Sequence, residues 1–114
     1  MSTNDQDAPY RAPADRSIED VSGLNRIPCE PPLDGSDPTQ DNVTRASFAA
    51  RAVLAYAVAT GNGDLDTCIS DMLGDLQHLL DVLSEWDEGN GVGTIESLVE
   101  SGSVHYEAEI RGEL

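Results

Sequence analysis

Residues 65–86, LDTCISDMLGDLQHLLDVLSEW, carry the most regular hydrophobic pattern of the chain. Apolar residues recur there at three- and four-residue steps, as one face of an amphipathic α-helix requires. Asp64 or Asp66 is a suitable N-cap for this helix. The stripe consists of Leu65, Ile69, Met72, Leu73, Leu76, Leu79, Leu80, Leu83 and Trp86. We predict a helix over 65–86, and a fold of packed helices that covers its stripe.

Two further helices are predicted on either side of this one. Residues 42–60 lack proline and are rich in alanine, the strongest helix former, and Gly61 can end that helix in the left-handed conformation. Its apolar residues lie nearly all round the axis, which predicts a buried helix. Thr94 can cap a third helix over 94–111, in which Gly102 permits a kink or a break.

The first 41 residues differ in composition. All six prolines fall before residue 39, and the hydrophobic residues there follow no sustained period. Such a segment cannot bury enough apolar area to offset its ordering entropy. We predict a disordered, acidic, proline-rich tail over 1–41, in which the patch from Ile18 to Ile27 docks or forms a short turn. Residues 42–114 then form the helical domain.

The predicted fold class is all-α, a small three-helix bundle. Three helices of this length enclose a small core, which is only marginally stable alone. The first helix also needs more cover than two neighbours provide. We therefore expect the bundle to form a dimer.

The charge of the chain is its most unusual property. The 22 acidic residues outnumber the 6 basic ones, all of them arginine, and the net charge is -16. Carboxylates hold water and hydrated cations, and salt screens their repulsion, so this composition favours a halophilic origin. A GC-rich genome would explain the missing lysine but not the acid excess.

We therefore expect salt to stabilise the fold. Self-repulsion should partly unfold the protein at low salt, because few counterions screen the carboxylates. The melting temperature, followed by circular dichroism, should rise between 0.1 M and 3 M KCl. A melting temperature that stays flat over that range would contradict the halophilic interpretation.

Composition also excludes several classes of function. A pI near 4.1 argues against direct binding to nucleic acid, which needs clustered basic residues. The sequence contains no run of about 18 apolar residues, which is the length that a membrane-spanning helix needs. The N-terminus has no signal-peptide pattern, and Cys29 and Cys68 form no CxxC pair, so we expect a cytoplasmic protein with reduced thiols.

Both histidines have a carboxylate at helical spacing, which raises a metal-site hypothesis. If the second and third helices pair antiparallel, Asp75, His78, His105 and Glu109 could hold a divalent ion. On a helical wheel His78 lies opposite the leucine stripe, which favours a solvated surface instead. The chain has no phosphate-loop or GxSxG motif. We expect no catalytic residues and no cofactor.

The segments ISDMLGDLQHLLDVL and HYEAEI resemble a family of small uncharacterised helical proteins from phages, plasmids and haloarchaeal elements. The resemblance covers residues 53–110 and implies an origin in a mobile element, but no activity. Its pattern, DLLxDLxH followed by HYxxE, falls on Asp71, Leu73, Asp75, Leu76, His78, His105, Tyr106 and Glu109.

The helix that carries Asp71 and Asp75 also resembles the second acidic motif of the MazG-type nucleoside triphosphate pyrophosphohydrolases. Their first motif, a cluster of glutamates on the preceding helix, has no counterpart in residues 42–60. Magnesium would therefore lack half of its ligands, and we reject this enzyme.

Two classes of function remain, besides the metal-binding helical enzyme considered above. The first is a small interaction or regulatory module whose partner is another protein or a second copy of the chain. Excess apolar surface without a catalytic set favours it. The alternative is a nucleic-acid mimic of the anti-restriction or anti-CRISPR type, whose carboxylates imitate phosphates. A comparison of the net charge with the average of the host's proteins distinguishes the two, because in a halophile such a charge is ordinary.

Overall fold

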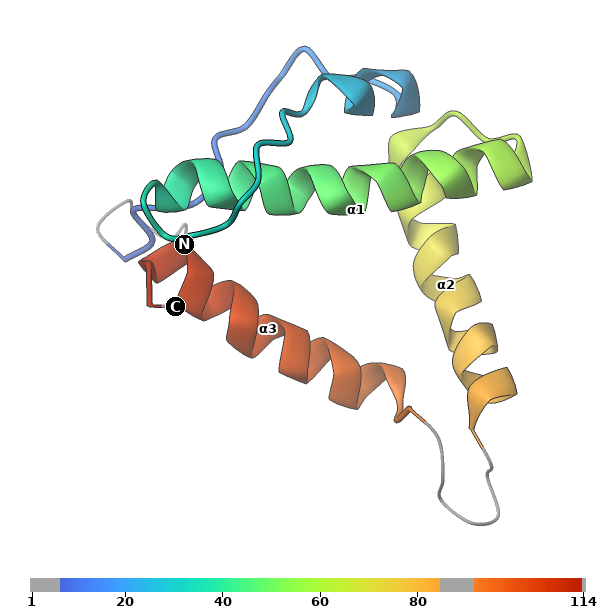
Figure 1. The fold of residues 1–114 in the computed structure, drawn as a ribbon. Coiled ribbons are helices and arrows are strands. Elements are labelled where there is room, and N and C mark those ends of the chain that lie inside the picture. The colour runs from blue at the N-terminus through green and yellow to red at the C-terminus, as the bar shows by residue number, and fades with distance from the viewer. Residues whose placement is uncertain (1–6, 85–91, 114) are drawn as a thin grey trace.

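The computed structural model describes residues 7–84 and 92–113. Their helices are the 3₁₀-helix η1 (Val21–Arg26) and the α-helices α1 (Pro38–Thr60), α2 (Leu65–Leu83) and α3 (Ile95–Arg111). The described residues contain no strand. α2 leads away from the C-terminal end of α1, and α3 returns to its N-terminal end (Figure 1). All three α-helices contact one another, so the all-α fold of three packed helices is confirmed.

α1 begins four residues before the predicted start, because Pro38 belongs to the helix. Proline is favoured at the first helical position, where its missing N–H is not needed. The side chain of Asp37 caps this end, accepting a hydrogen bond from Gln40 N at 3.2 Å. At the other end Gly61, with φ 75°, donates its N–H to Ala57 O, so the predicted left-handed cap is confirmed.

The starts of α2 and α3 also follow the predicted caps. Asp64 accepts a hydrogen bond from Thr67 N at 3.0 Å, and Thr94 forms a capping box with Ser97. α3 continues through Gly102 without a break. α2 ends at Leu83, three residues before the predicted end, and Trp86 lies outside the described residues. None of the described helices is long and apolar enough to cross a membrane.

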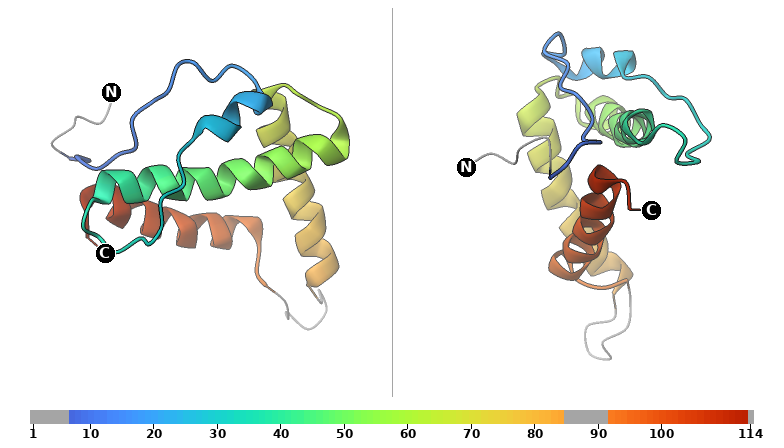
Figure 2. Two further views of the ribbon diagram at one scale, coloured as in Figure 1. Left: turned by 45° about the horizontal axis from the view of Figure 1, so that its top comes forward. Right: turned by 90° about the vertical axis from the view of Figure 1, so that its left-hand side faces the viewer.

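Residues 7–37, here called the N-terminal strap, differ from the disordered tail predicted over 1–41, although η1 lies in the patch from Ile18 to Ile27 that was expected to dock or form a short turn. η1 packs against α1, and the strap follows α1 back to its start (Figure 2). Glu30 N donates to Thr44 Oγ1 at 3.0 Å, and Gly35 N donates to Asp41 Oδ2 at 2.9 Å. Hydrogen bonds to α1 thus order a segment that has little apolar area to bury.

The hydrophobic core is small, and α1 is not buried on all sides as predicted. Phe48 is 45 % exposed and Val58 is 85 % exposed, because only the strap and two helices cover α1. Beneath the strap the buried face of α1 is polar, with Asp41, Asn42, Thr44 and Ser47. Among the described residues, the buried apolar ones are Ala8, Ala50, Ala57, Cys68 and Ile110.

Candidate functional site

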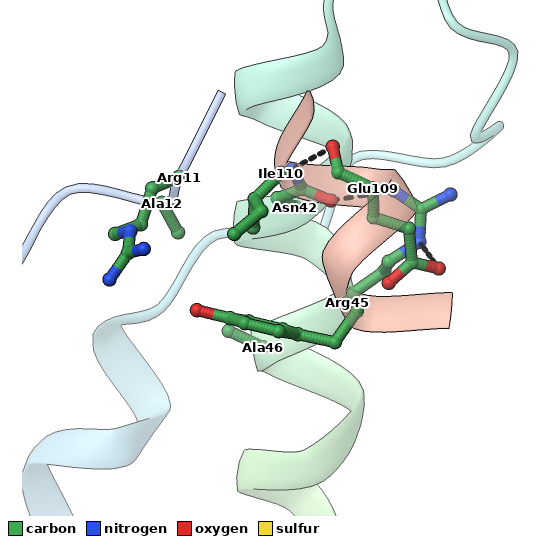
Figure 3. Close-up of a pocket in the computed structure, with 8 residues that line it drawn as sticks. Arg11, Ala12, Asn42, Arg45, Ala46, Glu109 and Ile110 are labelled. Atoms are coloured by element: carbon green, nitrogen blue, oxygen red, sulfur yellow. Dashed lines mark hydrogen bonds and ion pairs between the residues drawn. The ribbon is translucent and has the colours of Figure 1, made fainter. Parts of the chain in front are cut away.

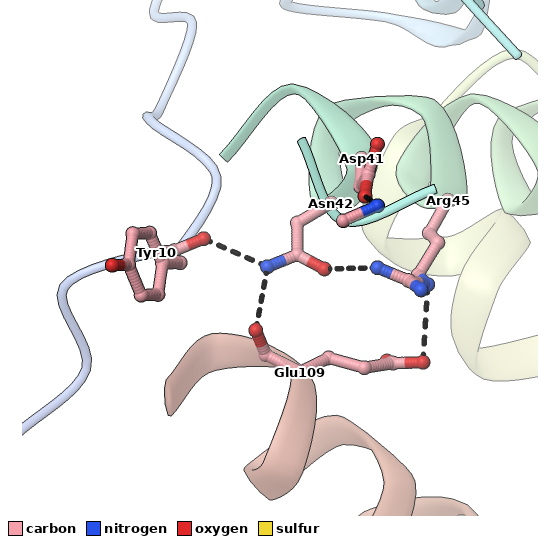
Figure 4. Close-up of polar contacts among 6 residues, drawn as sticks. Tyr10, Asp41, Asn42, Arg45 and Glu109 are labelled. Carbon is pink, nitrogen blue, oxygen red and sulfur yellow. Dashed lines mark hydrogen bonds and ion pairs between the residues drawn. The ribbon is translucent and has the colours of Figure 1, made fainter. Parts of the chain in front are cut away.

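The strap, the start of α1 and the end of α3 meet at one buried side chain, Asn42 (Figure 4). It is only 8 % exposed. Its Nδ2 donates to Tyr10 O at 2.8 Å and to Glu109 O at 3.0 Å. Its Oδ1 accepts a hydrogen bond from Arg45 Nη1 at 2.7 Å. One amide thus joins three segments that are far apart in sequence.

Further contacts reinforce this junction. Arg45 Nε and Glu109 Oε2 form an ion pair at 3.0 Å, with both side chains mostly shielded from water. Tyr10 N donates to Ile110 O at 3.0 Å. The Tyr10 ring lies against Gly112, where an added Cβ would come within 2.6 Å of it. The junction is therefore a tightly fitted polar contact, and its charged groups are partnered.

A cavity of about 320 Å³ opens beside the junction (Figure 3). Arg11 comes from the strap, Ala46 from α1, and Tyr106 and Ile110 from α3. Its volume lies at the lower end of the range of ligand sites, about 300–1,000 Å³. Glu109, the acid that lines it, is held by Arg45. Glu109 therefore already has a structural partner at this wall of the cavity.

The four residues of the metal-site hypothesis do not come together. Asp75 Oδ2 accepts a hydrogen bond from Tyr56 OH at 2.5 Å, whereas Glu109 is paired with Arg45. Tyr56 and Arg45 are about three turns, or about 16 Å, apart along the axis of α1. His78 and His105 are exposed. Within the part of the chain that is described, no group of three or more His, Cys, Asp or Glu could hold a metal ion.

The Tyr56–Asp75 contact has a measurable consequence at high pH. The hydrogen bond to Asp75, together with desolvation and the negative charges of Asp75 and Asp71, raises the pKa of Tyr56 to about 12. An unfolded tyrosine titrates near pH 10. The hydroxyl proton of Tyr56 therefore makes its full contribution to the stability of the fold below about pH 10. This contribution is lost as the pH rises towards about 12.

We expect a titration of tyrosinate absorbance to show a late step near pH 12 that Tyr56→Phe removes. The same substitution should lower the melting temperature at neutral pH, because Asp75 loses its donor. The control is Tyr106→Phe, which changes a half-exposed ring on α3 and should keep the late step. A late step that survives in Tyr56→Phe would contradict this assignment.

The apolar stripes of α2 and α3 are only half covered. Leu73 is 49 % exposed and Leu98 is 41 % exposed, although both lie on the apolar side of an amphipathic helix. The side chains of these stripes that remain widely exposed are here called the α2–α3 apolar surface, and they are Ile69, Leu73, Leu79, Leu83, Leu98, Val99 and Tyr106.

The sequence predicted the apolar stripes of α2 and α3 but not their exposure, since the stripe of α2 was expected to be covered, and it gave no prediction of the junction. Asn42 lies in an alanine-rich helix, and its partners are backbone carbonyls more than thirty residues away. One signal was present, since Asp41, Thr44 and Ser47 place polar side chains at three-residue steps in the same helix. A polar row of this kind indicates that polar backbone, and not an apolar element, packs there.

Comparison of the chain with family models, with curated proteins and with solved structures gives no match.

Proposed function

We propose that the protein is a small acidic interaction module without catalysis, and that the partner of its α2–α3 apolar surface is a second copy of the chain. The observation that carries the proposal is the half-covered stripe on both helices. In a monomer that is stable alone, such a stripe faces the core. Here the fold leaves it in solvent, which is typical of a surface that another protein covers.

A permanent dimer is the form of association that this surface favours. Obligate homodimers bury about 2,000–5,000 Å² in total, and their interfaces are more hydrophobic than those of transient complexes. The seven side chains of the α2–α3 apolar surface are aliphatic or aromatic, and each residue is at least 41 % exposed. A two-fold dimer would cover the same surface on both copies.

The net charge of -16 sets the conditions for this association. Two such chains repel each other, and the repulsion is long-ranged at low salt but confined to about 3 Å at 1 M salt. On a helical wheel Asp66, Asp71 and Asp81 of α2 lie outside the apolar stripe. All three are exposed, Asp66 beside the stripe and Asp71 and Asp81 on the opposite face, so salt can screen them and association should strengthen with KCl.

Sedimentation equilibrium in about 2 M KCl tests the proposal. We expect a mass twice the 12.2 kDa of the chain at micromolar concentration. A chain that remains monomeric at about 100 µM would overturn the second copy as the partner. If that monomer also binds a hydrophobic dye, its apolar surface is accessible, and another protein becomes the candidate occupant.

A further inference from the structure

A second cavity, of about 370 Å³, lies between the strap and α1, away from the α2–α3 apolar surface. Its charge is opposite to that of the whole chain. Arg26 and Arg51 line it, two of the 6 basic residues, and none of its described lining residues is acidic. In a chain with 22 acidic and 6 basic residues, a positively charged lining is unexpected for an ordinary surface cavity.

The two arginines are held by different elements. Arg26 ends η1, and its Nη2 donates to Ser17 O at 2.6 Å, which fixes the guanidinium against the strap. The carboxylates of Asp15 and Asp20 act on Arg26 from outside the cavity and offset part of its charge. Arg51 comes from α1 and has no hydrogen-bond or ion-pair partner among the described residues. Arg51 thus contributes the less compensated positive charge.

We propose that this cavity binds the phosphate group of a small molecule, with Arg51 as its main counter-charge and Arg26 as the second. A guanidinium presents a planar fork of N–H donors that fits the oxygens of a phosphate. The volume exceeds what a bare phosphate needs, and Leu24, Ile27 and Leu54 supply apolar wall for an organic part. This site is separate from the proposed interaction surface and does not depend on association.

The test is an amide NMR titration with inorganic phosphate, with KCl adjusted to keep the ionic strength constant. We expect saturable shifts confined to the amides of residues 21–29 and of Ser47 to Leu54, the two segments that hold the lining residues. Arg51→Ala should weaken the apparent affinity at least tenfold. Arg51 makes no hydrogen bond or ion pair with the described residues, so this variant should fold as the wild type does.

Arg16→Ala is the matched control, because it removes the same charge from an exposed position in the strap that lines neither cavity. Its affinity should stay within twofold of the wild type. Equal weakening in both variants would show non-specific attraction and overturn the proposal. Shifts that never saturate, or saturation with acetate and not with phosphate, would also overturn it.

Discussion

We expect that replacing Leu73 and Leu98 together by glutamate will lower the proposed self-association constant in molar KCl at least a hundredfold, while the helices remain folded. The two side chains are half exposed in one chain, so glutamate can reach solvent in the monomer. In the dimer each copy would bring two carboxylates to the interface, where burial of an unpaired charge costs several kcal/mol. Each 1.4 kcal/mol corresponds to a tenfold change in affinity.

The matched control changes two valines that lie off the α2–α3 apolar surface. Val58 of α1 is 85 % exposed and Val82 of α2 is 81 % exposed. The double variant Val58→Glu with Val82→Glu adds the same charge and should associate like the wild type. Sedimentation velocity over a concentration series measures both variants, and circular dichroism checks their helices. If both variants lose association equally, added charge is the cause, and the proposed interface is wrong.

The helices were predictable because their signals are local. The stripe of α2 depends only on residues three and four apart. The caps at Asp64, Thr94 and Gly61 each act within a few residues of the helix end. The predicted start of α1 is four residues too late. Pro38 is the last proline of a proline-rich segment and was therefore assigned to the tail, although proline is also favoured at the first position of a helix.

The path of the strap and the arrangement of the candidate site were not predictable from these patterns. The strap is held by hydrogen bonds to Thr44 and Asp41 of α1, and hydrophobic periodicity carries no information about such contacts. The metal-site hypothesis required a particular pairing of α2 with α3. Instead, contacts with α1 fix Asp75 and Glu109 at separate positions, through Tyr56 and Arg45.

Asn42→Ala should destabilise the fold by about 2–4 kcal/mol, the largest expected effect of a single substitution in this chain. The change removes one donor from the part-buried carbonyl of Tyr10, one from that of Glu109, which keeps Gly112 N, and one acceptor from Arg45. A buried polar group left without a partner costs about 1–3 kcal/mol. Since domains are stable by only about 5–15 kcal/mol, urea unfolding in KCl should show a large shift of the midpoint.

Two further variants separate the role of this amide from a general effect of substitution. Asn25→Ala changes an exposed asparagine with one weak contact at 3.4 Å and should alter stability by less than about 0.5 kcal/mol. Asn42→Asp keeps the acceptor for Arg45 but loses both donors, so it should destabilise nearly as much as alanine. Hydrogen exchange at Tyr10, whose amide bonds to Ile110, should accelerate in both Asn42 variants. If Asn42→Ala unfolds at the wild-type midpoint, the prediction is wrong. The strap is then held by its apolar and backbone contacts, and Asn42 contributes little to the free energy of unfolding.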